Sequence, residues 1–108
     1  MKKSRKILLE KELMRVVNIL KKDKTIKKIF LFGSLSNGEI NDASDVDIIV
    51  VQDTKARFLD RLDALYRTIV PNVGMDILVY TPEEFNIMKE KSFFLRYALA
   101  TGRMIYAA

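Results

Sequence analysis

The sequence predicts an α/β fold in which a small β-sheet is flanked by helices. Four apolar runs, near residues 26–32, 45–51, 73–80 and 103–106, have the length and the β-branched and aromatic content of strands. Segments with the apolar spacing of amphipathic helices alternate with these runs. The chain has 108 residues, of which 49% are hydrophobic, so we expect one domain that spans residues 1–108.

The first half of the chain is expected to contain one helix and two strands. Residues 4–23 read as the helix, because apolar side chains recur there every three or four positions: Leu9, Leu13, Val16, Val17 and Leu20. The first strand follows over residues 26–32. A turn from Gly33 to Gly38 and a polar connector lead to the second strand, residues 45–51. Its apolar residues fall on both faces, as in a central strand that is covered on both sides.

A second helix is expected after the second strand. Asp53 or Thr54 is a plausible N-cap, and the helix would run to about Val70. Its buried stripe would consist of Phe58, Leu62, Leu65, Tyr66 and Ile69. Pro71, Asn72 and Gly74 then end the helix and turn the chain.

The third strand and the C-terminal helices complete the predicted order. After the strand at residues 73–80, Thr81 is a candidate N-cap with Pro82 at the first helical position and Glu84 placed to close a capping box. One or two helices would reach residue 101. Gly102 fits a helix C-cap, and a short strand would follow it.

Two aspartates stand at the start of the second predicted strand. Asp45 and Asp47 are two residues apart, so a strand projects both carboxylates from one face. Such a pair stays ionised only if a cation or strong donors compensate it. Mg²⁺ takes oxygen ligands, and it typically uses one or two carboxylates together with phosphate oxygens and water. We therefore interpret Asp45 and Asp47 as metal ligands rather than as a polar strand entry.

A glycine and a serine end the first predicted strand. Gly33 lets the backbone turn sharply and approach a ligand, and the amides and the Ser34 hydroxyl that follow can point at phosphate oxygens. Gly33 and Ser34 are therefore candidate nucleotide-binding residues. Ser36 and Asn37, in the same turn, are candidates as well, with ordinary loop roles as the alternative.

A third carboxylate lies in the third predicted strand. Asp76 is the single acid of that apolar run. If this strand lies beside the second one, Asp76 completes the ligand set of a two-metal phosphoryl or nucleotidyl transfer site. Gly74 leaves the alternative that the strand bends and exposes Asp76 to solvent.

The combined pattern resembles a known superfamily. Gly33-Ser34, ten intervening residues, Asp45-Val46-Asp47 and the later strand aspartate Asp76 are similar to nucleotidyltransferases of the DNA polymerase β type, and in particular to the short minimal nucleotidyltransferases. This resemblance implies an α/β (α+β) fold with a small mixed β-sheet flanked by helices. It also implies Mg²⁺-dependent transfer of AMP from ATP to a hydroxyl.

The same resemblance implies roles for the candidate residues. Asp45 and Asp47 would bridge two metal ions and the triphosphate, and Asp76 would hold the metal ion that activates the acceptor. Gly33 and Ser34 would hold the β- and γ-phosphates. Members often carry an arginine where this chain has Asn37, and that difference removes a positive charge from the phosphate side.

Resemblance also suggests a protein partner. Minimal nucleotidyltransferases often pair with HEPN-family proteins as antitoxin and toxin, so the acceptor is expected on another chain. The candidate docking surfaces are the basic first helix and an aromatic segment with Phe93, Phe94, Leu95 and Tyr97. The alternative function is a non-catalytic nucleotide-binding or antitoxin module that acts by binding its partner. The sequence is compatible with a homo-oligomer and with a hetero-oligomer.

Composition excludes several kinds of site. The chain has no cysteine and no histidine, which removes disulfides, thiolate chemistry and histidine-based zinc sites. Of its net charge of +5, residues 1–28 contribute 11 basic against 3 acidic side chains. We interpret this excess as a solvated helix face rather than as a nucleic-acid site. Nothing resembles a signal peptide or a membrane span, so a cytoplasmic protein is expected.

Overall fold

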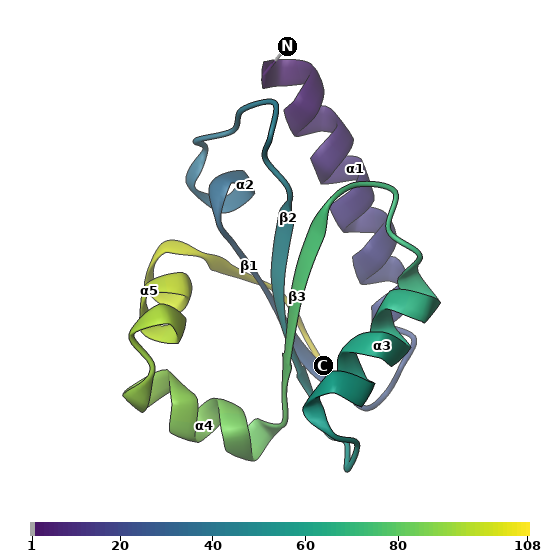
Figure 1. Ribbon diagram of the computed structural model, residues 1–108, viewed down its shortest axis with the longest axis vertical. Coiled ribbons are helices and arrows are strands. Elements are labelled where there is room, and N and C mark those ends of the chain that lie inside the picture. The colour runs from purple at the N-terminus through teal and green to yellow at the C-terminus, as the bar shows by residue number, and fades with distance from the viewer. Residues whose placement is uncertain (1) are drawn as a thin grey trace.

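The computed structural model describes residues 2–108, apart from the side chain of Lys2. It contains one β-sheet with helices on both faces (Figure 1). In chain order the elements are α1 (Lys2–Leu20), β1 (Ile26–Phe32), α2 (Ser34–Asn37), β2 (Val46–Gln52), α3 (Phe58–Ile69), β3 (Met75–Tyr80), α4 (Pro82–Lys91), α5 (Phe93–Thr101) and β4 (Arg103–Ala107).

The four strands form a mixed sheet in the order β3-β2-β1-β4. Strand β1 is antiparallel to both of its neighbours, whereas β2 and β3 are parallel to each other. Phe32 pairs with Asp47, and Asp47 pairs with Asp76. The end of β1 therefore lies beside the starts of β2 and β3, and these three positions form one edge of the sheet.

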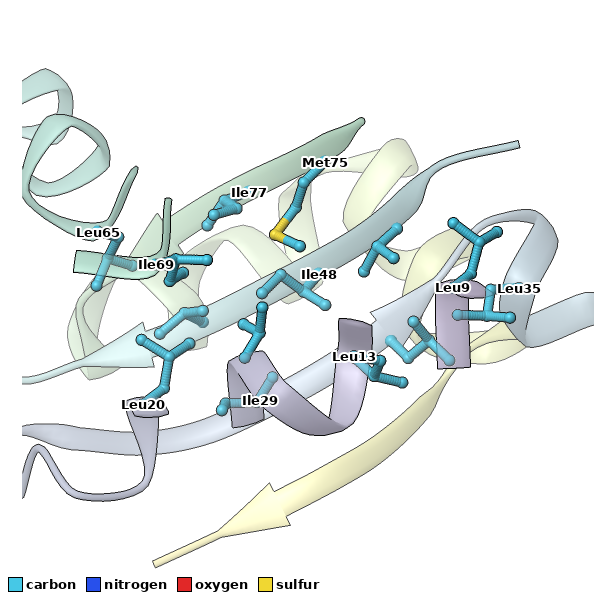
Figure 2. Close-up of a cluster of buried hydrophobic side chains, with 14 of the residues drawn as sticks. Leu9, Leu13, Leu20, Ile29, Leu35, Ile48, Leu65, Ile69, Met75 and Ile77 are labelled. Carbon is cyan, nitrogen blue, oxygen red and sulfur yellow. The ribbon is translucent and has the colours of Figure 1, made fainter. Parts of the chain in front are cut away.

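Helices cover both faces of the sheet, which confirms that the second strand is central. On one face, apolar residues of α1 and α3 pack against the strands, among them Leu9, Leu13, Leu20, Ile29, Ile48, Leu65, Ile69 and Ile77 (Figure 2). On the other face, α4 and α5 contribute Phe85, Leu95 and Ala98, which pack with Ile49 and Val51. Alternate residues of β2 thus enter two different cores.

Helix boundaries differ from the sequence expectation at two places. Helix α1 ends at Leu20 rather than near residue 23. Helix α3 begins at Phe58 with Arg57 as its N-cap, so the prediction of an Asp53 or Thr54 cap is wrong. The Asp53 amide instead donates to the Thr25 carbonyl at 2.8 Å, and the Thr54 hydroxyl accepts from the Ala56 amide at 3.1 Å. These bonds keep the segment before α3 out of the helix.

The buried stripe of α3 also contains a charged residue that the apolar pattern missed. Phe58 is 40% exposed, whereas Arg61 is buried. The Arg61 guanidinium donates to the Ala56 carbonyl at 2.7 Å and to a Glu84 carboxylate oxygen at 2.6 Å. Glu84 closes the predicted capping box with Thr81. Arg61 therefore fixes α3 to the start of α4, and long-range pairing of this kind has no local sequence signal.

An ion pair within α1 forms hydrogen bonds with the end of α3 and with the loop after it. The Glu12 side chain, which is buried, accepts from Arg15 Nε at 2.7 Å and from the Asn72 amide at 2.6 Å. Arg15 Nη1 in turn donates to the Ile69 carbonyl at 3.0 Å. Hydrogen bonding with Arg15 is the main reason that the pKa of Glu12 falls to about 2.

We expect Glu12→Gln to lower the free energy of unfolding at neutral pH by about 1.5–3 kcal/mol, because it removes charged hydrogen bonds from a buried group. A carboxyl whose pKa is lowered on folding stabilises the protein above its ordinary pKa of 4.5, and this stabilisation is lost as the pH falls toward 2. Urea unfolding of both proteins at several pH values measures the difference, which should shrink in acid. Glu10→Gln, on the exposed side of α1, is the matched control. An equal loss in both variants would contradict the assignment.

Within the part of the chain that the structure describes, no helix combines the length and the apolar character that crossing a membrane requires.

Candidate active site

Three aspartates lie close together where β2 and β3 begin, and they lie on one face of the sheet. Asp47 lies in β2, Asp45 stands immediately before that strand, and Asp76 lies opposite Asp47 in the parallel neighbour β3. Side chains two residues apart on a strand lie on the same face, so Asp47 shares a face with Ile49, and Asp76 shares it with Leu78. Ile49 and Leu78 pack under α4 and α5, so the aspartates lie on the face that these helices cover. The sequence expectation that Asp76 would lie beside Asp47 is confirmed. Asp76 is also exposed to solvent, which is the alternative that Gly74 suggested.

The pKa of Asp47 is raised from its ordinary value of 3.8 to about 6. Burial is the first cause, the charge of Asp76 and hydrogen bonding with Asp76 follow, and the charge of Asp45 contributes least. Without a cation, Asp47 therefore holds its proton to a higher pH than an ordinary aspartate does. A bound cation would favour the ionised form.

Gly33 lies against this carboxylate at the end of β1. Its backbone has φ 75° and ψ −161°, a region that is open almost only to glycine. A Cβ atom at this position would lie 2.2 Å from Asp47 Oδ2. The predicted turn contains the short helix α2, in which the Ser36 and Asn37 amides both donate to the Gly33 carbonyl at 3.1 Å. The first amides of such a turn lack partners within the helix and can face an anion.

Arg5 is a neighbour of the site that the sequence analysis missed. From α1, its Nε and Nη2 atoms donate to the Ser44 carbonyl at 3.0 and 2.6 Å. Nη2 also lies 3.6 Å from Asp45 Oδ1. Nothing in the sequence distinguishes Arg5 from the other basic residues of the first helix, because its partner is 39 positions away.

Asp45 lies between this arginine and Gly74. A Cβ atom on Gly74 would lie 2.3 Å from Asp45 Oδ1, so the carboxylate needs a glycine there. Among the described residues, no group of three or more acidic side chains is arranged to hold a metal ion. Asp47 and Asp76 still offer adjacent carboxylates, and two carboxylates with phosphate oxygens are a donor set that Mg²⁺ uses.

Asn37 makes a local hydrogen bond in this structure, whereas Ser36 bonds to the end of α5. The Asn37 side-chain oxygen accepts from the Glu39 amide at 2.9 Å, and the Ser36 hydroxyl donates to the Thr101 carbonyl at 3.4 Å. The Asn37 bond is an ordinary loop role, and the Ser36 bond joins the turn to α5. Ser34, at the first position of α2, is half-buried.

An apolar groove of about 440 Å³ opens beside Asp76. It is lined by Phe32, Leu62, Tyr66, Asp76, Ile77, Leu78 and Phe94. The Phe32 and Phe94 rings meet edge to face, with centroids 5.5 Å apart. Because four elements contribute to this groove, no single stretch of sequence indicates it.

Comparison with known proteins identifies the fold and the family. The family model described as "Polymerase beta, Nucleotidyltransferase" matches residues 14–108. The chain belongs to this nucleotidyltransferase family. A relative from Methanocaldococcus jannaschii, named as a protein adenylyltransferase, is 34% identical over 100 residues, which cover 90% of this chain and 97% of the relative.

Solved structures agree with this nucleotidyltransferase fold. A structure named as a nucleotidyltransferase from Sulfolobus solfataricus has a TM-score of 0.67 at 20% identity, with 94% of this chain and 83% of that chain covered. A toxin-antitoxin structure with AMP-PNP has a TM-score of 0.56 at 19% identity, with 88% and 73% covered. The mixed sheet flanked by helices and the family expected from Gly33, Ser34 and the aspartates are confirmed.

Proposed function

We propose that this nucleotidyltransferase moves AMP from ATP to a hydroxyl group on a partner protein, with Mg²⁺ as its metal ion. The observation that carries the proposal is the pairing of Asp47 with Asp76 in parallel strands, with Gly33 against Asp47. The relative named as a protein adenylyltransferase and the neighbour with AMP-PNP favour AMP and ATP.

In this proposal Asp47 and Asp76 hold Mg²⁺, and Asp45 is the third carboxylate of the set. When bound, the metal ion polarises the phosphate oxygens and offsets the charge that develops on them. Gly33 allows the backbone to approach the β- and γ-phosphates, and the Ser34 hydroxyl donates to them. The Ser36 and Asn37 side chains would reach the phosphates only by giving up their present hydrogen bonds to Thr101 and Glu39.

The transfer itself requires positioning more than covalent chemistry by the protein. The acceptor oxygen forms a bond to the α-phosphorus while the bond to pyrophosphate breaks, and the hydroxyl proton leaves to a carboxylate or to water. Asp76 is exposed on β3, at the edge of the sheet, where an acceptor can approach it. Holding the two reactants in this geometry would supply much of the rate enhancement.

A HEPN-family protein is the partner that we propose as acceptor. Toxin-antitoxin complexes are among the structural neighbours. On α5, Phe93 is 84% exposed and Tyr97 is 68% exposed, so both can contact another chain. Leu95 is fully buried, which overturns its place in the expected docking surface, because it packs in the core under α5. The basic first helix is the second surface that we propose for docking this partner.

A non-catalytic antitoxin is the second candidate function. Asn37 brings no positive charge to the phosphate side, and its side-chain oxygen is held by the Glu39 amide. Weak nucleotide binding would follow from that arrangement, and the protein would then act by binding its partner.

Pyrophosphate release separates the two functions. The protein is incubated with Mg²⁺ and ATP, either with a HEPN-family partner or with a panel of small hydroxylated acceptors. The proposal expects release only with the partner, together with a mass increase of one AMP on that protein. Sustained turnover on a small acceptor alone would contradict the protein acceptor, whereas partner binding without release would support the non-catalytic function.

A further inference from the structure

The apolar groove beside Asp76 is continuous with the proposed phosphate site. Phe32, one wall of the groove, directly precedes Gly33, and its backbone pairs with Asp47. Asp76 belongs both to the groove and to the carboxylate pair. The Gly33 turn, the paired carboxylates and the groove therefore follow one another along a single path. Figure 1 shows α5, which carries Phe94, on the side of the sheet away from α1 and α3.

The walls of the groove suit a flat aromatic group. Phe94 is 49% exposed although it meets Phe32 edge to face, so part of its ring surface is free for stacking. Leu78 adds apolar surface on the same face of β3, and Ile77 and Leu62, on the opposite face, continue the lining around this edge strand. The volume of about 440 Å³ lies in the lower part of the range for small-molecule sites. Stacking on an aromatic ring is available to any nucleobase, because every base has a π-face.

Hydrogen-bonding groups for the edge of a base are scarce in the groove. The Tyr66 hydroxyl already donates to the Met75 carbonyl at 2.7 Å. Asp76 is the other polar side chain of the lining, and in the proposed function it holds metal. Reading of a base by its edge needs donors and acceptors at fixed positions, which these side chains do not supply.

We propose that this groove is the nucleobase site of the bound nucleoside triphosphate, and that it discriminates weakly between adenine and guanine. The inference rests on the proposed function, because it places the phosphates at Gly33 and the carboxylates. It adds the site of the base, the role of Phe94 as a stacking residue and the breadth of the nucleotide substrate class.

Calorimetric titration of the whole chain with ATP, GTP and inorganic tripolyphosphate, each with Mg²⁺, tests this inference. We expect ATP and GTP to bind with similar affinity. Phe94→Ala should weaken both by roughly 5- to 150-fold, the range for loss of one base–aromatic stack. Tripolyphosphate has no base, so its affinity should not change. Phe94→Trp should keep nucleotide affinity, because indole also stacks.

Phe93→Ala is the matched control, because this neighbouring aromatic residue of α5 lies outside the groove. It should leave the affinity of all three ligands unchanged. If Phe94→Ala leaves ATP affinity unchanged, or weakens ATP and tripolyphosphate equally, the groove is not the base site, even though the proposed function stands. If the wild-type protein binds none of the three ligands, the proposed function fails and this inference fails with it.

Discussion

Replacing Asp47 with asparagine is expected to slow AMP transfer on the order of a thousandfold, because a metal-dependent stabilisation of several kcal/mol is lost. Asparagine keeps the shape of the side chain but removes the charge that a metal ion requires. Asp53→Asn, at an exposed position just beyond the other end of β2, is the matched control and should retain activity. Steady-state rates of AMP transfer decide this prediction. A rate near wild type for Asp47→Asn would exclude Asp47 as a metal ligand.

The same substitution should stabilise the metal-free protein in a pH-dependent way. The folded state binds a proton at Asp47 up to about pH 6, whereas the unfolded chain releases it near the ordinary value of 3.8. Stability contributed by this group is therefore lost as the pH rises from about 4 to about 6. Allowing for solvent screening of a half-exposed group, Asp47→Asn should gain about 1–2 kcal/mol at pH 7 and little at pH 4.

Thermal melts at both pH values measure this gain, with Asp53→Asn as the reference. Added Mg²⁺ and ATP should stabilise the wild type by about 2.7 kcal/mol at 100 times Kd and should stabilise Asp47→Asn much less. A variant that is destabilised equally at pH 4 and pH 7 would show that Asp47 contributes packing rather than repulsion.

Gly33→Ala is expected to damage both stability and transfer. The alanine Cβ would lie 2.2 Å from Asp47 Oδ2, and φ 75° with ψ −161° suits glycine alone. The backbone strain should cost about 1–3 kcal/mol. Relief of the clash would displace Asp47 or α2, and a displacement of about 1 Å at a reacting centre can cost roughly a hundredfold in rate.

Gly38→Ala tests the effect of backbone strain in the absence of a steric clash. Gly38 also has a positive φ, 82°, but no atom lies within 4 Å of its added Cβ. This variant should lose about 1–2 kcal/mol of stability and keep the activity of the wild type. Unfolding by urea and transfer rates on the three proteins provide the comparison. Equal activity of Gly33→Ala and Gly38→Ala would contradict the close approach of Gly33 to the site.

Local signals were enough to predict the sheet and the position of the three aspartates. The strand around Asp76 and the strand around Asp47 follow from apolar runs, and the parallel pairing then brings the carboxylates together. The capping box of Thr81 and Glu84 was also visible, because its partners are three residues apart.

Features that depend on distant contacts were not predictable in the same way. Arg5 reaches Ser44 across 39 positions, and the buried Arg61 pairs with Glu84 across 23. Apolar spacing placed Phe58 in the core, although Arg61 occupies that face of α3. The groove at Phe94 likewise exists only after β1, α3, β3 and α5 have come together.

The most direct test of the central claim uses ATP labelled separately at the α-phosphate and at the γ-phosphate, with Mg²⁺ and a HEPN-family partner. The proposed transfer predicts that the α-label becomes covalently attached to the partner and that the γ-label leaves in pyrophosphate. Asp47→Asn should transfer neither label. Attachment of the γ-label, or no attachment of the α-label to a partner that binds the wild-type protein, would contradict nucleotidyl transfer by the face that Asp47 and Asp76 form.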